Sequence, residues 1–211
     1  MTDPQHGGRR VVLASNNAKK LAELRRILEP LVPGIQVLGL ADFPAYDEPA
    51  ETEPTFEGNA LIKARAALAA TGLPSLADDS GLCVDALNGM PGVLSARWSG
   101  VAKADGGDAA NNALLLSQLG DVPAERRTAR FRAAVALCTP DGREIVELGE
   151  MAGRVLTAEH GGGGFGYDPL FAADGYDVST AELPPEEKDR ISHRGKALVA
   201  IAPAVVEALS H

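Results

Sequence analysis

The sequence is organised around one short stretch, Leu76-Ala77-Asp78-Asp79-Ser80-Gly81-Leu82. Apolar residues precede and follow it, so two adjacent carboxylates interrupt an otherwise strand-like run. Adjacent carboxylates repel each other and are costly to bury unless positive charge lies close by. A divalent cation is the simplest such partner, because hard cations such as Mg²⁺ choose oxygen ligands. The alternative is a solvated turn between two strands, and the rest of the chain has to decide between the two.

The composition indicates a globular protein. The chain has 211 residues, of which 45% are hydrophobic, and this is enough for the core of one domain over residues 1–211. We expect the polar residues 1–8 to form a disordered tail. The net charge of −9 argues against nucleic-acid binding. Cys83 and Cys138 lie in apolar runs and indicate reduced core residues. Without a membrane-length apolar run or a signal-peptide pattern, we expect a cytoplasmic protein.

The N-terminal segment predicts a strand, a polar loop and a helix. Residues 10–14 are mostly apolar, and apolar residues recur at helical spacing over residues 21–28. The loop between them is rich in N-cap residues. A helix N-terminus offers free N–H groups and a positive dipole end, which suit phosphate, although an ordinary strand–helix connection is the alternative. The loop residues are Ser15, Asn16, Asn17, Ala18, Lys19 and Lys20.

The following segment continues the alternation of strands and helices. Residues 35–38 predict a second strand, and an acidic, proline-rich loop follows at residues 42–54. Such a loop is usually solvated, but one of its carboxylates could also reach a metal ion. Apolar spacing predicts a helix over residues 59–71, ended by Gly72. We expect a further packing helix to begin at Asp108, its N-cap.

The second half of the chain predicts antiparallel strands. Residues 129–139 and 143–150 flank Pro140-Asp141-Gly142, a strong turn signal, and predict a β-hairpin. Residues 153–157 predict one more strand. Combined with the first half, this pattern predicts an α/β fold with a long mixed β-sheet flanked by helices.

Two late stretches carry candidate binding residues. Five glycines within residues 161–166 free the backbone to approach a ligand closely. The neighbouring Phe165 and Tyr167 could stack on a flat ring, and a flexible connector is the alternative. A basic cluster, Ser192-His193-Arg194-Gly195-Lys196, opens the last helix and indicates an anion and polar-edge site. For His193 alone, a structural role is the competing interpretation.

Six segments, spread in order over residues 10 to 210, resemble the inosine triphosphate pyrophosphatase family, whose bacterial members are XTP/dITP diphosphatases. Each motif alone is weakly specific, and the six together are highly specific. They are Ser15-Asn16-Asn17-Ala18-Lys19-Lys20, Thr55-Phe56-Glu57-Gly58-Asn59-Ala60, Ala77-Asp78-Asp79-Ser80-Gly81-Leu82, Pro91-Gly92-Val93-Leu94-Ser95-Ala96-Arg97, Gly164-Phe165-Gly166-Tyr167-Asp168-Pro169, and Glu187-Lys188 with Ser192-His193-Arg194-Gly195.

The resemblance implies a fold and a reaction. The fold would be a long mixed sheet with helices, in two lobes around a central active-site cleft, and the protein would be a homodimer. The reaction would hydrolyse the non-canonical purine nucleoside triphosphates XTP, ITP and dITP to the monophosphate and pyrophosphate, with Mg²⁺ as cofactor, and so sanitise the nucleotide pool. A site whose donors pair with a 6-oxo group would leave them unpaired against the 6-amino group of adenine, which would spare ATP.

The resemblance also implies a role for each candidate residue. Asp79 would bind Mg²⁺ and help to activate the attacking water, Glu51 would be the second metal ligand, and Asp78 would support Asp79 without touching the metal. Residues 15–20 would hold the triphosphate, with Lys20 as its cation. The other substrate contacts would be Ser80, the base-binding residues Phe165, Gly166, Tyr167 and Asp168, with Phe165 stacked on the base, then Lys188, and finally His193 and Arg194 at the oxo edge.

The sequence departs from the family pattern at three positions. Gly58 stands where the family commonly has Glu, Ala50 where the acidic loop often has a paired Glu, and Met151 where a Trp is frequent. If the missing Glu at position 58 ligates metal or water, Glu57 could replace it.

Two alternative functions remain open. One is a pyrophosphatase acting on pyrimidine or methylated nucleotides, and the other is a nucleotide sensor without turnover, favoured only by Gly58.

Overall fold

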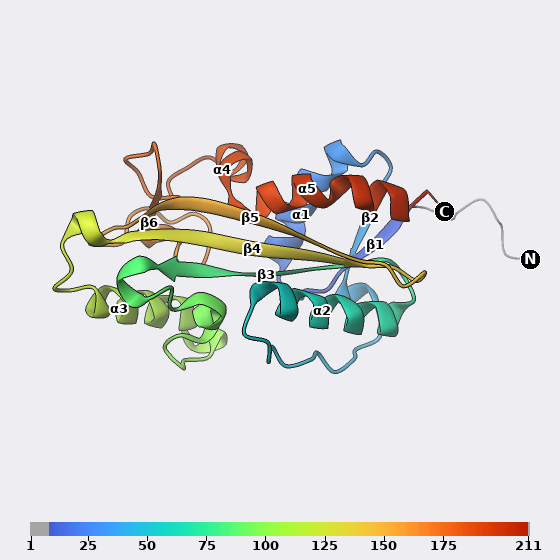
Figure 1. Ribbon diagram of the computed structural model, residues 1–211, viewed down its shortest axis with the longest axis horizontal. Coiled ribbons are helices and arrows are strands. Elements are labelled where there is room, and N and C mark those ends of the chain that lie inside the picture. Colours follow the sequence, from blue (N-terminus) through green and yellow to red (C-terminus); the bar gives the residue numbers. More distant parts are fainter. Residues whose placement is uncertain (1–8, 211) are drawn as a thin grey trace, which may run out of the picture. The chain divides into compact units, whose positions relative to one another are not determined.

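The computed structural model describes residues 9–210, except for the side chains of Lys19 and Lys103 (Figure 1). The predicted tail, residues 1–8, lies outside the described residues. The described strands form a sheet in the order β2-β1-β3-β4-β5-β6. Strand β1 is parallel to β2 and β3, and β5 is antiparallel to β6, which confirms a mixed sheet. The strands are β1 (Arg10–Leu13), β2 (Gln36–Gly39), β3 (Ser75–Val84), β4 (Thr128–Cys138), β5 (Glu144–Val155) and β6 (Phe171–Ala173).

Helices alternate with the early strands and close the chain. They are α1 (Ala18–Leu31), α2 (Phe56–Thr71), α3 (Gly107–Gln118), α4 (Pro185–Ile191) and α5 (His193–Ala208), with short 3₁₀ turns that include η3 (Gly92–Arg97) and η6 (Asp168–Leu170). Helices and strands therefore mix as predicted for an α/β fold. Within residues 9–210, every helix is too short or too polar to cross a bilayer.

The chain divides into two compact units. Unit 1 comprises the described residues up to Asp79, then Ala134–Leu148 and the residues from Arg194 onward. Unit 2 comprises Ser80–Ala133 and Gly149–His193. The long strands β3, β4 and β5 run through both units.

Unit 1 is built in layers around β1. Apolar side chains of β1, β2, β3 and β4 form one core cluster with residues of α1 and α5, among them Leu24, Leu28, Leu198 and Ile201. Helix α2 also packs on β1, and Figure 1 shows α2 and α5 on opposite sides of these strands. Both faces of β1 are therefore covered, as expected for a parallel strand made of Val11, Val12 and Leu13.

Unit 2 has a separate core. Apolar residues of β3, β4, β5 and β6 pack with Leu115 of α3 and with Leu119, the C-cap residue of that helix. The Phe131 and Phe171 rings meet edge to face at 4.8 Å between centroids, a favoured aromatic geometry. Met151, which stands where a Trp was expected, is buried in this cluster, so the change is a packing change.

The structure decides one open alternative and corrects three sequence-based boundaries. The Asp-Asp-Ser-Gly stretch is part of β3 and is not a turn. Helix α2 begins three residues before the predicted 59, because Thr55 is its N-cap and accepts the Gly58 N–H at 3.1 Å. Asp108 lies inside the first turn of α3, after an N-cap at Gly106. The strand predicted at residues 153–157 is the end of β5, which continues without a break to Val155.

Gly81 explains how β3 continues past the acidic pair into unit 2. A Cβ at this position would lie 2.3 Å from the Gly92 carbonyl oxygen and 2.4 Å from Ser95 Oγ. The absence of a side chain lets the η3 segment approach the strand, and Ser95 Oγ then accepts the Leu82 N–H at 2.9 Å. This glycine is a packing requirement of unit 2.

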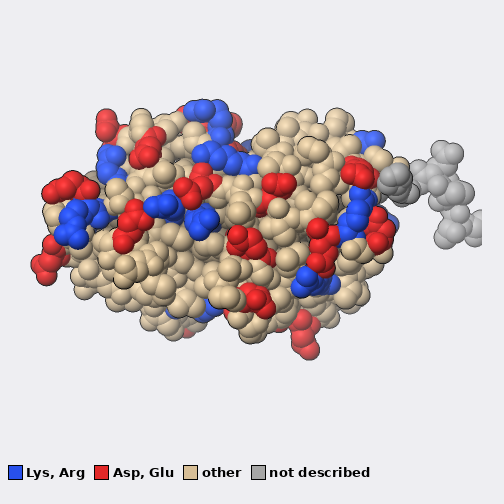
Figure 2. Space-filling model, in the orientation of Figure 1, with Lys and Arg blue, Asp and Glu red and all other residues tan. Residues whose placement is uncertain are grey.

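Charged side chains of both signs are interspersed on the visible face in Figure 2. The described Lys and Arg residues on that face do not form a broad basic patch. This pattern is in line with the acidic net charge of −9.

Candidate active site

Strand β3 places its two carboxylates in different surroundings. Successive side chains of a strand point to opposite faces. Asp78 therefore meets side chains of α1 and α5, whereas Asp79 meets side chains of α2. Both are buried, with exposed fractions of 4% for Asp78 and 7% for Asp79. The alternation of the strand separates the pair into two groups within unit 1.

The first group surrounds Asp78 with cations. Lys20 Nζ lies 3.1 Å from both carboxylate oxygens, and Arg194 Nε donates to Oδ2 at 3.0 Å. Burial alone would raise the pKa of Asp78, but the charges of Lys20, Arg194 and Lys63 outweigh it and hold that pKa well below its usual range. Asp78 is therefore ionised and fully engaged. The pKa of Lys20 is lowered, chiefly by burial, although Asp78 opposes the shift.

Arg194 is the hub of this buried group. Its Nη1 donates to Glu23 Oε2 at 2.7 Å, while its Nε holds Asp78. The side chain is 4% exposed. Burial would lower the pKa of Arg194, but Asp78 and Glu23 raise it above its usual value. In this structure Nε and Nη1 of Arg194 donate to Asp78 and Glu23. The predicted contact of Arg194 with the oxo edge of a purine is therefore not seen in this geometry.

The second group surrounds Asp79 and is less saturated with positive charge. Asn59 Nδ2 donates to Asp79 Oδ2 at 3.3 Å, and Lys63 Nζ lies 3.0 Å from Oδ1. Lys63 Nζ also lies 3.0 Å from Glu51 Oε1. Burial raises the pKa of Asp79 despite the opposing charge of Lys63, and Glu51 adds to the rise. The Asp79 carboxylate is thus a better proton acceptor than an ordinary Asp.

The donor set around Asp79 fits a magnesium ion. Asp79 and Glu51 both approach one cation, the Lys63 ammonium, and both present the hard oxygen atoms that Mg²⁺ prefers. Within residues 9–210, no cluster of three or more His, Cys, Asp or Glu side chains has metal-binding geometry. A Mg²⁺ ion commonly takes one or two protein carboxylates and completes its shell with water and substrate phosphates. A pair of carboxylates is therefore sufficient.

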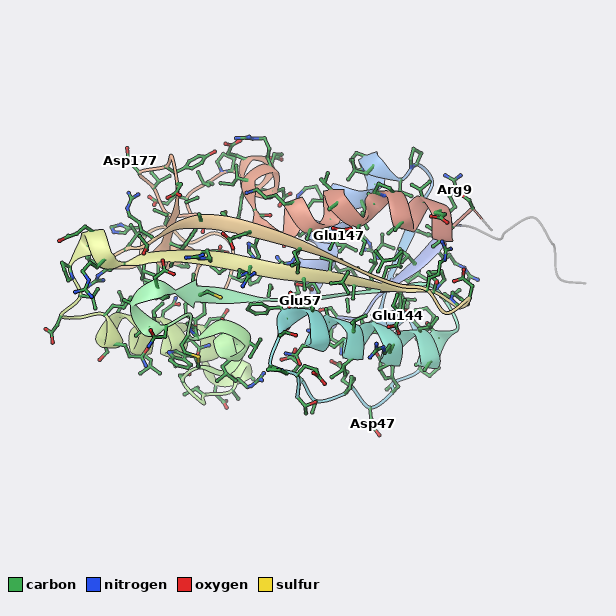
Figure 3. The ribbon with its side chains drawn as sticks, in the orientation of Figure 1. Arg9, Asp47, Glu57, Glu144, Glu147 and Asp177 are labelled. Atoms are coloured by element: carbon green, nitrogen blue, oxygen red, sulfur yellow. The ribbon has the colours of Figure 1, made fainter. Side chains whose placement is uncertain are left out.

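The acidic loop also explains Gly58. A Cβ at position 58 would lie 2.6 Å from Glu53 Cβ and 2.7 Å from its Cγ, so Glu53 occupies the space that a side chain there would need. The Glu53 N–H donates to Asn59 Oδ1 at 2.9 Å, and Asn59 also donates to Asp79. Glu57, considered as a replacement from sequence, is half-buried in the first turn of α2 (Figure 3). Glu53 therefore fills the space beside Gly58.

The loop between β1 and α1 is organised by short-range caps. Ser15 Oγ accepts the Asn17 N–H at 3.1 Å, and Asn17 Oδ1 accepts the Lys20 N–H at 3.4 Å. Asn16 is exposed, and its Nδ2 donates to Glu48 of the acidic loop. Ala18 is the first residue of α1. The predicted strand, loop and helix are confirmed, and the helix N-terminus lies where an anion could be bound.

Unit 2 contains the glycine-rich loop and an ion pair beneath it. Lys188 Nζ lies 2.5 Å from Asp168 Oδ2, which also accepts the Phe165 N–H at 2.8 Å. Thr180 Oγ1 donates to the other Asp168 oxygen at 3.0 Å. The Lys188 ammonium lies 5.3 Å from the centre of the half-buried Phe165 ring, a cation–π geometry. Asp168 thus links Lys188 to the backbone of the loop.

The other predicted binding residues of unit 2 differ in how far they are buried and in what they contact. Tyr167 is 4% exposed, belongs to the core of unit 2, and donates its hydroxyl to the Ser95 carbonyl at 2.9 Å, so it is an anchor of the loop and not an open platform. His193 is 7% exposed and stacks on Phe131 at 4.9 Å with a 10° interplanar angle. Ser80 is half-buried in β3 directly after Asp79.

Several residues that shape these groups were missed from sequence. Asn59 and Lys63 are four positions apart on α2 and so share one helix face, a signal that could have found them. Glu53 lies in the acidic loop singled out from sequence, whereas Glu23 carries no local signal, because its partner Arg194 is 171 positions away. In unit 2, Asp108 and Asn112 of α3 contact the glycine-rich loop.

The fold and these groups describe an α/β protein with a buried acid–base cluster and a carboxylate pair suited to a cation. Comparison with known proteins agrees. The profile of the Ham1 family matches residues 11–204. A dITP/XTP pyrophosphatase of Nocardia farcinica is 63% identical over 197 residues, which cover 93% of this chain and 94% of that protein.

Solved structures give the same result. The crystal structure of a nucleoside-triphosphatase, or dITP/XTP pyrophosphatase, from Mycobacterium abscessus has 55% identity and a TM-score of 0.74 over 92% of this chain and 99% of its own. A HAM1 protein from Coxiella burnetii has 39% identity and a TM-score of 0.82 over 94% and 99%. The chain belongs to the Ham1 family, and the family resemblance seen in its motifs is confirmed.

Proposed function

We propose that this protein hydrolyses non-canonical purine nucleoside triphosphates, namely XTP, ITP and dITP, to the monophosphate and pyrophosphate. The observation that carries the proposal is the Asp79 group, a carboxylate of raised pKa held by Asn59 and Lys63 next to Glu51. The names of similar proteins support the same activity, since relatives of 63% and 55% identity are called dITP/XTP pyrophosphatases.

In the proposed reaction, Asp79 accepts a proton from water. The water oxygen bonds to the α-phosphorus, the bond between that phosphorus and the bridging oxygen breaks, and pyrophosphate leaves with the bridging oxygen. A Mg²⁺ ion held by Asp79 and Glu51 would orient the phosphates and lower the pKa of a bound water. Lys63, whose pKa is raised by Asp79, Asp78 and Glu51 against the effect of burial, remains protonated and offsets the carboxylate charge.

The two ends of the nucleotide are assigned to different residues. In unit 1, residues 15–20 and the N-terminus of α1 bind the triphosphate, and Lys20 contributes positive charge. In unit 2, Phe165 stacks on the base and Gly166, Asp168, Lys188 and His193 contact the substrate. Ser80 contacts the substrate beside Asp79. Arg194 would reach the oxo edge only by exchanging a partner of its present network.

The remaining proposals concern the whole protein. We place it in the cytoplasm as a homodimer that protects the nucleotide pool. A cytoplasmic nucleotide pool is rich in ATP, so discrimination against the 6-amino group is part of the proposed function.

A panel of nucleotides tests the proposal. Purified protein with Mg²⁺ should release pyrophosphate, and not orthophosphate, from ITP, dITP and XTP, and should act poorly on ATP. Removal of the metal with EDTA should stop the reaction, and added Mg²⁺ should restore it. Comparable turnover of dTTP or UTP would support the pyrimidine alternative. Binding of ITP without release of pyrophosphate would contradict the proposed enzyme activity and support the alternative function, a nucleotide sensor without turnover.

A further inference from the structure

We propose that Asp108 and Asn112 of α3 are positioning residues that hold the base-binding loop through the backbone of Gly166. Asp108 Oδ2 accepts the Gly166 N–H at 3.1 Å, and Asn112 Nδ2 donates to the Gly166 carbonyl at 3.3 Å. The two side chains are four positions apart and so lie on one face of the helix. The inference rests on the proposed function, which assigns this loop to the purine base.

Gly166 is the point at which such a clamp has the most effect on the loop. Its φ of +61° is in the left-handed region, which glycine adopts without steric cost, and both its N–H and its carbonyl have partners on α3. It lies between Phe165, whose ring is proposed to stack on the base, and Tyr167, which is buried. Fixing both polar groups of Gly166 therefore fixes the direction in which the Phe165 ring leaves the core.

Helix α3 also anchors the far side of the loop. The Tyr167 hydroxyl donates to the Ser95 carbonyl at 2.9 Å, and Asn111 Nδ2 reaches the same carbonyl at 3.3 Å. Burial and, second, the charge of Asp108 raise the pKa of Tyr167 above its ordinary value, so the hydroxyl stays a donor. Two consecutive loop residues are thus tied to the helix, Gly166 directly and Tyr167 through η3.

Asn112 retains this role in spite of an unfavourable feature. It is 3% exposed, its Nδ2 also donates to Glu159 at 2.8 Å, and its Oδ1 accepts no hydrogen bond from the described residues. Rotating the Asn112 amide would not give its oxygen a hydrogen-bond donor, because the oxygen would then face two acceptors, the Glu159 carboxylate and the Gly166 carbonyl. A buried acceptor without a donor costs free energy. Because burying Asn112 in this way costs free energy, we infer that its role is to hold the Gly166 carbonyl and not to stabilise the fold.

The test compares Asn112→Ala with Gln118→Ala. Gln118 is a matched control, because it is an amide on the same helix that hydrogen-bonds elsewhere, to Trp98 Nε1 at 2.9 Å. Asn112→Ala should raise KM for ITP about fivefold with little change in kcat, the effect of one lost hydrogen bond. It should narrow the preference for ITP over ATP and leave inhibition by inorganic triphosphate unchanged. It should also speed hydrogen–deuterium exchange in peptides covering residues 160–170, whereas Gln118→Ala should not.

A second pair of variants tests the other half of the clamp. Asp108→Ala should raise KM and hasten exchange in the same way, and Asp108→Asn, which keeps an acceptor oxygen, should restore most of both. A merely structural role would not give this rescue together with an unchanged response to inorganic triphosphate.

Two results would overturn the inference. One is an Asn112→Ala protein with the exchange and KM of the Gln118→Ala control, and the other is equal weakening of ITP and inorganic triphosphate. If the wild-type protein does not hydrolyse ITP, the proposed function fails. The clamp then stands or falls on the exchange data and on the affinity for IMP, which are measured without turnover.

Discussion

Asp78 and Asp79 are neighbours in β3, yet the fold treats them in opposite ways. Asp78 is held by Lys20 and Arg194, and its pKa is strongly depressed. Asp79 meets Asn59 and Lys63, and its pKa is raised. Because both are buried to a similar degree, burial does not make the difference. The two pKa values differ because Asp78 is close to more cations than Asp79 is.

This comparison separates structure from chemistry in one dipeptide. A carboxylate that is fully paired stays ionised and fixed, and it has little capacity left to accept a proton. A carboxylate of raised pKa, with a second carboxylate across its lysine, can share a metal ion and take a proton. We therefore expect substitutions at Asp79 to affect turnover and substitutions at Asp78 to affect stability.

The largest expected effect is that of Asp79→Asn on turnover. The amide cannot accept the proton, so kcat for ITP should fall about a thousandfold or more. The folded pKa of Asp79 lies above its unfolded value, which means that folding disfavours its ionised form, so Asn should not lower stability. Pyrophosphate release and denaturant unfolding measure the two quantities. A fully active Asp79→Asn protein would remove Asp79 from the mechanism.

Asp78→Asn should have the converse effect. It leaves Lys20 and Arg194 buried with less compensating charge, and breaking a buried ion pair costs about 3 kcal/mol or more. Urea denaturation measures the loss. Asp141→Asn is a suitable control, because Asp141 pairs with Arg143 at the surface and its replacement should change stability little. An Asp78→Asn protein as stable as the wild type would mean that Asp78 does not anchor the network.

The same contrast sets the pH dependence of stability. A depressed folded pKa contributes stability that is present above the unfolded value, about 3.9, and is lost as the pH falls. Below about pH 4 the free energy of unfolding should drop by about 1.4 kcal/mol per pH unit on account of Asp78. Asp78→Asn should flatten this slope. Asp79 acts with the opposite sign and in a higher window, between about pH 4 and its raised folded pKa, because below about pH 4 it is protonated in both states. Asp79→Asn should therefore leave the slope below about pH 4 unchanged, and equal slopes in both variants would contradict the assignment.

The sequence was sufficient where local pattern dominates. Alternation of apolar runs predicted β1, α1 and the β4–β5 hairpin, and the motifs predicted the family. The turn considered at Asp78 was wrong, because a charged pair is compatible with a buried strand once cations are close. Those cations come from afar, since Arg194 is 116 positions from Asp78 and 171 from Glu23. No local signal reports such a pairing.

The same limit applies to unit 2. The glycine-rich loop was found from its composition, and Phe165 and Asp168 were named with it. Tyr167 was considered for stacking on a flat ring, but its side chain lies in the core, where its hydroxyl donates to the Ser95 carbonyl. Aromatic residues beside glycines can either present a ring or anchor the turn, and only the packing distinguishes the two.

Glu23→Gln is the mildest change that still tests the comparison. Glutamine keeps an acceptor for Arg194 Nη1, now 2.7 Å from Glu23 Oε2, but removes one charge. A hydrogen bond to a charged acceptor is worth about 1 kcal/mol more than one to a neutral acceptor, so stability should fall by about that amount. Because Arg194 keeps Asp78, and Glu23 contacts Arg194 but no group assigned to proton transfer, kcat for ITP should stay within about twofold. A larger fall in kcat with unchanged stability would show that the Asp78 network acts on the Asp79 group, and the division between an anchoring and a reacting carboxylate would then be wrong.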